Sequence, residues 1–415
     1  MTWPLYQDHQ VPNTLPEQGH RGLWYERFFD RYDDDWTVLK EKKDSKGKLL
    51  QREGKASWVE DNAKLAGHGE ALALAVQRQL ELITALGGRG AVFQADWHFA
   101  TGLGLPHPVE NGLAWHHTLG VPYLAGSAVK GLVRAWVEVW DESLGDAQSE
   151  QRQQRLKHWF GFADQPVFVD GEARERRASQ AGAFLFFDAL PIKPVRLRAD
   201  VMTPHLGKWY EQGGEIEDWH REPEKVPADW HAPVPVSFLV ADKPSLLFGI
   251  APRRPDCPKD ELDAVFQALK QALQWLGAGA KTAVGYGLMQ EDEKATQDLS
   301  RDQERREQQH KQAAEARRQE AERQAARAGL PPFERALLEL IDARPNPNQS
   351  EIAYLIAEVK NGRWQGQEKQ DVARWLRARM QATKGQWKSV SNAKKPEKDR
   401  EHQNTLLVIQ WLKDG

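Results

Sequence analysis

The sequence is short of the residues that build a disulfide framework or a cysteine-rich metal site. Its 415 residues contain one cysteine, Cys257, and only four methionines. A single cysteine excludes an internal disulfide and any zinc site made of several cysteines. No second His or Cys stands at metal-ligand spacing from a histidine such as His205. We therefore expect no metal and no cofactor.

Long apolar runs and an excess of one charge are also lacking. No stretch reads as a membrane span, and Met1–Gln18 is polar and proline-rich, without the apolar centre of a signal peptide. We expect a soluble protein of the reducing cytoplasm. The 57 Lys+Arg and 60 Asp+Glu give a formal charge of −3. That balance excludes a uniformly basic nucleic-acid binder, so any RNA or DNA site must be local.

Regular apolar spacing appears between residues 66 and 290. Residues 69–86 repeat apolar side chains at helical intervals, and 260–276 do so again. Alternation predicts a half-buried strand over 91–99, with Trp97 on its apolar face, and another over 195–201. A buried strand is expected at 183–188. Two more strands are predicted at 236–240 and 246–250, and they are expected to form a hairpin that turns at 242–245.

This mixture predicts an α+β fold of the ferredoxin or RNA-recognition-motif type, with helices layered on an antiparallel sheet. Four parts follow: an N-terminal extension, 1–65; a core domain, 66–290; an exposed helical linker, 291–328; and a helical C-terminal module, 329–415. The linker is expected to be helical because it lacks Pro and Gly and carries many Glu/Arg pairs three or four residues apart.

Two short motifs carry chemistry. In Gly126–Gly131 a glycine, Ser127 and Lys130 stand where a loop enters a helix, which also carries Arg134. Helix N-termini attract anions and Lys130 adds a positive charge, although Ser127 as an ordinary N-cap fits as well. In the second motif four glycines surround a lysine and a threonine and allow close approach of another backbone, while a tight turn with a solvated lysine fits equally. These residues are Gly277, Gly279, Lys281, Thr282, Gly285 and Gly287.

Together the two motifs resemble a known family. The stretch 122–134 (PYLAGSAVKGLVR) resembles the Pro-Tyr-(Ile/Leu)-Pro-Gly-Ser-Ser-Leu-Lys-Gly signature of RAMP proteins, the RNA-binding subunits of CRISPR systems, and 277–287 resembles that family's glycine-rich loop. Ala125 and Ala128 replace a usual proline and serine. Three further stretches, 101–112, 186–191 and 200–205, are similar to the sixth RAMP subunit of type III-B (Cmr) effector complexes, with Leu206 in place of a usual tyrosine.

The resemblance implies an antiviral RNA-binding subunit that caps the complex near the 3′ end of the CRISPR RNA. It would hold guide RNA, flank the target duplex and contact a neighbouring RAMP backbone subunit and other Cmr subunits. Cutting of target RNA would belong to neighbouring subunits, so we expect no catalytic residue and no enzyme activity here. Lys130, Arg134, Lys281 and the glycine-rich turns would grip phosphates. His205 would hydrogen-bond or stack, and Trp209, Tyr210 and Trp219 either wedge against bases or simply pack.

Three other interpretations compete with these. A metal-free RNA-processing endoribonuclease of the same superfamily would use a histidine base, with His98, His116, His117 and His205 as candidates. An adaptor would recruit a protein through the helical tail. Asp33, Asp34 and Asp35 could bind a metal, but a solvated turn fits better because no His or second carboxylate cluster follows at ligand spacing.

The C-terminal module is expected to be mildly basic. From residue 329 onward 15 Lys+Arg stand against 11 Asp+Glu, a net of 15 − 11 = +4. A helix with arginines facing outward and Trp375 buried suits RNA, an acidic protein surface, or simply solvent. The basic residues concentrate at Arg374, Arg377, Arg379, Lys384 and Lys388, interleaved with Trp375 and Trp387.

Overall fold

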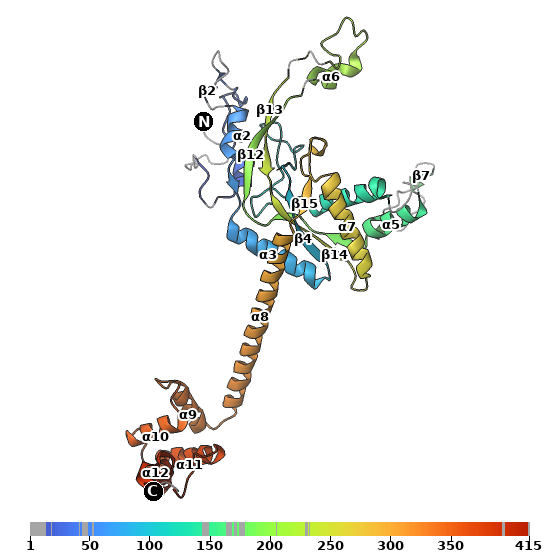
Figure 1. Ribbon diagram of the computed structural model, residues 1–415. Coiled ribbons are helices and arrows are strands. Elements are labelled where there is room, and N and C mark those ends of the chain that lie inside the picture. The colour runs from blue at the N-terminus through green and yellow to red at the C-terminus, as the bar shows by residue number, and fades with distance from the viewer. Residues whose placement is uncertain are drawn as a thin grey trace. The chain divides into compact units, whose positions relative to one another are not determined.

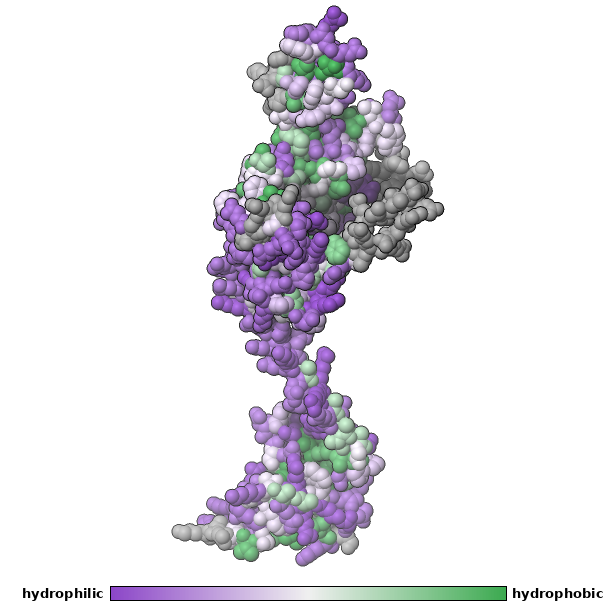
Figure 2. All heavy atoms as spheres, turned by 90° about the vertical axis from the view of Figure 1, so that its right-hand side faces the viewer, coloured by the Kyte–Doolittle hydropathy of each residue, from purple (hydrophilic) through white to green (hydrophobic). Residues whose placement is uncertain are grey.

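The computed structural model describes residues 14–17, 19–40, 42–43, 49–51, 54–142, 149–162, 168–169, 172–173, 179–204, 206–228, 231, 233–391 and 395–413. Its contacts divide the chain into two units, Met1–Glu307 and Gln308–Gly415. Hydrophilic residues cover most of the face shown in Figure 2. Within the described residues, no helix is long and apolar enough to cross a bilayer.

The first unit mixes helices and antiparallel strands (Figure 1), which confirms the predicted α+β class. Its helices are α1 (Arg21–Arg27), α2 (Lys55–Asn62), α3 (Gly69–Ala85), α4 (Gly126–Ala135), the π-helical turn η1 (Trp136–Trp140), α5 (Glu150–Phe160), α6 (Gly207–Gln212), α7 (Lys259–Trp275) and the start of α8 (Glu293–Ala328), with 3-10 turns at Gly213–Glu215 and Thr282–Val284. Short strand pairs are β1 (Lys42–Lys43) with β2 (Leu49–Gln51), β6 (Gly161–Phe162) with β9 (Gln180–Ala181), and β7 (Phe168–Val169) with β8 (Glu172–Ala173).

The larger sheet has helices on both faces. Its strands run in the order β10 (Phe184–Phe186), β14 (Ser245–Pro252), β4 (Arg89–Ala95) and β15 (Met289–Glu291), with β11 (Leu190–Pro191) also paired to β14. Leu247 joins Val76 and Leu80 of α3 on one face. Phe248 and Phe93 pack with Phe266 of α7 on the other. Because both faces are covered, every residue of β14 is buried.

The smaller sheet carries the candidate site. Its order is β3 (Leu65–Ala66), β12 (Val195–Met202), β13 (Val236–Asp242) and β5 (His98–Phe99). One face packs into the main core with Trp58 of α2 through Leu239 and Ala241. On the other face, Phe238 and Val240 form a separate apolar cluster with Ala100 and Tyr286.

The predicted hairpin over 236–250 is wrong, because β13 and β14 belong to different sheets. Pro244 has no N–H to start a ladder between them, and Lys243 turns the chain with a φ of +46°. The link instead bonds to the connection between β4 and β5. Lys243 N donates to the Trp97 carbonyl (3.0 Å), and Pro244 O accepts from Ala95 N (2.9 Å).

The two alternating strands also differ from expectation. The predicted strand 91–99 is divided between the sheets as β4 and β5, and Trp97, in the bend between them, is 46% exposed. In β12 Val195 and Leu197 are buried as predicted, but Ala199 and Val201 are exposed. β12 becomes exposed where it continues toward α6 (Figure 1), although its partner β13 is still largely buried there. Alternation marks the pleat of a strand but not how far another layer covers it.

The N-terminal aromatic residues complete the core of the first unit. Tyr25, Phe29 and Trp58 lie in the same apolar cluster as the sheet residues. The His107 ring stacks on Tyr25 with centroids 4.3 Å apart, and its Nε2 bonds the Tyr25 carbonyl (2.9 Å). The domain boundary between residues 65 and 66 stays a prediction, although residues of the N-terminal extension pack with residues of the core domain.

The long polar helix and the helical module are both present, as the predicted fold class requires. The first turns of α8 pack on the first unit: Val92 N donates to Thr296 Oγ1 (2.9 Å), and Leu299 packs against Val76 and Leu80. The division into units falls inside α8, between Glu307 and Gln308. The second unit contains α9 (Pro332–Asp342), α10 (Glu351–Lys360), α11 (Gly366–Ala382), a 3-10 turn (Pro396–Lys398) and α12 (Arg400–Trp411), around a core that includes Leu337, Leu355, Leu376 and Trp411.

Candidate nucleic-acid interface

The start of α4 is already occupied by an internal carboxylate. Gly126 N donates to Asp188 Oδ1 at 2.6 Å, so an anion from a distant segment caps the positive end of the helix. A Cβ on Gly126 would lie 2.3 Å from the Phe186 carbonyl oxygen, which explains the glycine. The N-cap residue is Ala125, and Ser127 is exposed in the first turn. The interpretation of Ser127 as the N-cap is therefore wrong.

The cations of α4 lie on the side away from the core. Val129 and Val133 are buried, whereas Lys130 is half-buried and Arg134, one turn further on, is exposed. Arg134 Nε lies 3.6 Å from Glu138 Oε2, an exposed pair of small energetic value. Lys130 forms no ion pair within the described part of the chain. The α4 motif thus offers the charge of Lys130 rather than an empty helix terminus.

The glycine-rich loop is bonded to residues 98–100. Gly287 N donates to His98 O and Ala280 N donates to Ala100 O, both at 2.7 Å. A Cβ would lie 1.9 Å from Ala278 O at Gly287 and 2.1 Å from Ala100 O at Gly279. The backbone that approaches these glycines is therefore the chain's own. Gly277 has the same internal role, with Tyr286 O 2.9 Å from the position of a Cβ, whereas Gly285 faces open space.

Lys281 is held in an unusual conformation within this loop. Its φ is +58°, the left-handed region that costs a side-chain-bearing residue about 1–2 kcal/mol. Its Nζ lies 5.6 Å from the centre of the Phe238 ring, over the smaller sheet. Thr282 is half-buried and begins the following 3-10 turn. Strain of this kind is typical of functional loops, and here it fixes a lysine above a sheet.

A polar cluster that the sequence did not predict lies beside the loop. The Tyr286 hydroxyl donates to Asp200 Oδ2, and burial, followed by this bond, raises the pKa of Tyr286. His98 Nδ1 lies 3.6 Å from Asp242, which also pairs with Arg198 Nε at 2.5 Å. Burial lowers the pKa of His98 despite the two nearby carboxylates. Only the register of β5, β12 and β13 could have brought these residues together.

The described histidines proposed for catalysis lie on two separate elements, His98 on one and the neighbours His116 and His117 on the other. His98 lies on β5, where it forms ring contacts with Trp97 and Tyr286. His116 Nδ1 accepts from Leu119 N (3.3 Å) in a turn, and burial lowers its pKa. His117 is exposed. His205 lies outside the described residues.

Within the described part of the excursion over 203–235, the candidate aromatic residues are exposed. Tyr210 is 77% and Trp219 61% exposed, so packing does not account for them. Trp209 covers Gly213, where a Cβ would lie 2.4 Å from the indole ring. The acidic stretch near the N-terminus forms a turn, since Asp33 Oδ1 accepts from Asp35 N (3.0 Å) and Thr37 N (2.8 Å). Across the described residues no group of three His, Cys, Asp or Glu is placed to hold a metal.

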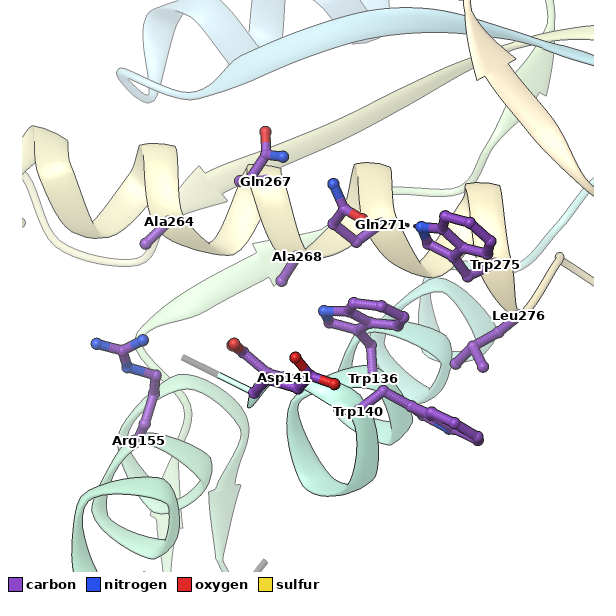
Figure 3. A pocket seen from close by; sticks show the side chains of 11 residues that line it. Trp136, Trp140, Asp141, Arg155, Ala264, Gln267, Ala268, Gln271, Trp275 and Leu276 are labelled. Atoms are coloured by element: carbon purple, nitrogen blue, oxygen red, sulfur yellow. Dashed lines mark hydrogen bonds between the residues drawn. The ribbon is translucent and has the colours of Figure 1, made fainter. Parts of the chain in front are cut away.

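A groove lined by tryptophans lies between η1, α5 and α7 (Figure 3). Its volume is about 810 Å³, and Trp140 and Trp275 are 56% and 65% exposed. The Trp275 Nε1 donates to Gln271 Oε1 (3.0 Å), which orients the ring. Asp141, Glu142 and Arg155 also line it, which gives a net charge of 1 − 2 = −1. Two carboxylates against one guanidinium disfavour phosphate, so the groove suits an apolar protein anchor better than RNA.

The basic residues of the C-terminal module are largely paired within it. Arg374 contacts Asp371 (2.8 Å), Arg379 contacts Glu351 (3.0 Å), and Lys388 contacts Asp399 (3.4 Å). Arg377 lies over the Trp387 ring, and Trp375 packs on the core of the module. Lys384 is exposed. The arginines face outward as predicted, with their charges mostly balanced by acidic neighbours.

Comparison with known proteins places this fold in a family. The RAMP superfamily model matches residues 79–290, which include α4 and the glycine-rich loop. The chain belongs to the RAMP superfamily. The resemblance to subunit six is confirmed by Cmr6 of Pyrococcus furiosus, 29% identical over 253 residues, covering 52% of this chain and 71% of the relative. Cmr6 of Saccharolobus solfataricus is 25% identical over 183 residues, covering 44% of this chain and about half (49%) of the relative.

Two solved structures are also similar to this RAMP chain. A chain of the type III-B Cmr-beta complex bound to cognate target RNA has a TM-score of 0.38 and 20% identity, covering 57% of this chain and 69% of that one. The crystal structure of Pyrococcus furiosus Cmr6 has a TM-score of 0.27 and 23% identity, covering 49% and 97%. The homology to Cmr6 supports a subunit of a type III-B CRISPR effector. Residues 291–415 lie outside the RAMP match.

Proposed function

We propose that this RAMP protein is a non-catalytic RNA-binding subunit of a type III-B CRISPR ribonucleoprotein, capping the complex near the 3′ end of the CRISPR RNA. The observation that carries the proposal is the glycine-rich loop, inside the RAMP match, which holds Lys281 over the smaller sheet. Lys130 and Arg134 on α4 supply further cations. Phosphate contacts carry no sequence information, which suits a subunit that accepts any guide.

The test removes both lysines from the assembled complex. Lys130→Ala with Lys281→Ala should weaken guide retention by a similar factor for several unrelated guides and leave folding intact, since neither lysine forms an ion pair among the described residues. The control is Lys259→Ala with Lys311→Ala, two exposed lysines outside the site. Unchanged retention, or a loss confined to some guides, would contradict the proposal.

Binding by the isolated chain should be weak. The net charge is −3, and a few phosphate contacts give little affinity at physiological salt. We expect a titration of labelled RNA to show micromolar or weaker binding that declines steeply with salt. Tight, salt-resistant binding of random RNA by the chain alone would count against this view.

The proposal assigns no cleavage to this subunit. Asp33 is engaged in its own turn, and among the described histidine candidates His98 lies on β5, away in sequence from the turn that holds His116 and His117. Alanine at Asp30, Asp33, Asp34 or Asp35 should leave every target-cleavage product of the intact complex unchanged. Loss of one product with the complex intact would refute the assignment. Processing of precursor RNA by the purified chain in EDTA would support the endoribonuclease instead.

The tryptophan groove is the proposed contact for the neighbouring RAMP subunit. Exposed tryptophans are frequent anchors of protein interfaces, and the acidic side chains favour a partner segment with an apolar side chain beside a cation. Trp140→Ala with Trp275→Ala should reduce incorporation of this subunit into the complex. Trp219→Ala, on the excursion, is the matched control and should leave subunit incorporation unchanged. Normal incorporation of the double variant would exclude the groove as the contact.

A further inference from the structure

A small basic pocket lies where the smaller sheet meets the link between β13 and β14. Its volume is about 250 Å³, and Lys193, Arg196 and Lys243 line it together with Asp242 and Ser245. The three cations come from the start of β12 and from the turn that carries the chain from one sheet to the other. None of these residues belongs to the two motifs that identify the family.

The charge of this pocket is not balanced by the protein around it. Asp242 is already paired with Arg198, at 2.5 Å. In the described ranges Lys193, Arg196 and Lys243 form no ion pair. Lys243 also adopts a left-handed φ of +46°, so the backbone bears strain to place this residue in the turn. Three exposed cations around one hollow are suited to a phosphate.

An exposed tryptophan is hydrogen-bonded to the same turn through its backbone. The Trp97 carbonyl accepts from Lys243 N at 3.0 Å. Its ring stacks on His98 with centroids 4.6 Å apart and meets the Tyr286 ring edge-on at 5.0 Å. Asp242 and Asp200 in turn contact His98 and Tyr286. The Trp97 side chain is thus held in place by ring contacts, while the residue remains 46% exposed. An exposed ring held in this way can stack with an RNA base.

We propose that Trp97 and the pocket formed by Lys193, Arg196 and Lys243 bind one nucleotide of single-stranded RNA, the base on the indole and the phosphate in the pocket. The site is continuous with the glycine-rich loop, because His98 accepts from Gly287 on one side and pairs with Asp242 on the other. The proposal rests on the proposed function: it extends the RNA path from Lys281 across β5 to the junction of the sheets.

The experiment measures binding of a fluorescein-labelled 15-nucleotide oligouridine to the full-length chain at low salt. Trp97→Ala should weaken binding about 5- to 20-fold, and Trp97→Phe, which keeps an aromatic ring, should restore most of it. The triple variant Lys193→Ala/Arg196→Ala/Lys243→Ala should also reduce the slope of log affinity against log salt by about 0.7 for each phosphate that it no longer neutralises. Trp36→Ala, an exposed tryptophan of the acidic turn with no proposed RNA contact, is the control.

A second measurement uses the unaltered chain and so does not depend on how the variants fold. Oligouridine containing 4-thiouridine should cross-link to the peptide that contains Trp97 or to the one that contains Lys243. Cross-links confined to other peptides would overturn the proposal. So would wild-type affinity of both the Trp97→Ala and the triple variant while the Lys130/Lys281 variant binds weakly, an outcome that leaves the proposed function standing. Wild-type affinity of all three would remove the proposed function as well.

Discussion

Replacing Gly287 by alanine tests how the glycine-rich loop is held. The new Cβ would lie 1.9 Å from the Ala278 carbonyl oxygen, at a φ of +69°. The left-handed conformation costs about 1–2 kcal/mol. The clash is relieved only by separating residues 278 and 287, which breaks the Ala278 N to Gly287 O bond (2.8 Å). The Gly287 N to His98 O bond (2.7 Å) is strained with it. Each bond is worth about 1 kcal/mol, and more when a buried donor is left without a partner, so we expect a loss of about 3–5 kcal/mol.

Gly285→Ala is the matched control for this prediction. Gly285 also has a positive φ, +92°, but its Cβ would meet no atom within 4 Å. Only conformational strain remains, about 1–2 kcal/mol. In differential scanning calorimetry of the full chain, Gly287→Ala should lower the Tm of the first unit by about 5–8 °C and Gly285→Ala by less than half as much. Equal Tm values for the two variants, or a wild-type Tm for Gly287→Ala, would refute the argument from backbone contact.

Three further predictions concern stability. Asp188→Ala removes the carboxylate that caps α4 and should lower the free energy of unfolding by about 1–2 kcal/mol, while Asp188→Asn, which keeps an acceptor, should lower it less. Equal losses for the two variants in chemical unfolding would show that the bond to Gly126 N is unimportant. Burial holds the pKa of His107 below its usual 6.5, as it does for His98 and His116, so the unfolded chain binds the proton first and the Tm should fall as the pH drops from 7.5 to 5.5. His107→Gln should make that fall less steep, and an unchanged slope would contradict the prediction. A chain ending at Glu307 should stay soluble and have the Tm of the first unit of the full chain, whereas a chain ending at Gln290 should have a lower Tm because it lacks Thr296 and Leu299. Aggregation of the longer fragment would mean that residues 308–415 are needed for folding.

Sequence reasoning found what depends on local pattern. The apolar spacing of 69–86 and 260–276 fixes two helices to within a residue or two, as α3 and α7, because helical periodicity is a property of neighbouring residues. The same holds for the polar helix α8, whose composition permits little else. The Gly126–Gly131 and Gly277–Gly287 motifs identified the RAMP family for a related reason, since each is a short stretch with a fixed spacing.

Tertiary structure alone decided which segments meet. Residues 236–240 and 246–250 are two apolar segments joined by a turn sequence, as in a hairpin. Pro244 and the bond from Lys243 to Trp97 nevertheless send β13 and β14 to different sheets. The capping of Gly126 by Asp188 joins residues 62 positions apart, and the bond between Tyr286 and Asp200 joins residues 86 positions apart. No local period encodes such pairs. They form because strand register and the close backbone approach at glycines such as Gly287 bring distant groups within bonding distance, which is also what places Trp97 beside a basic pocket.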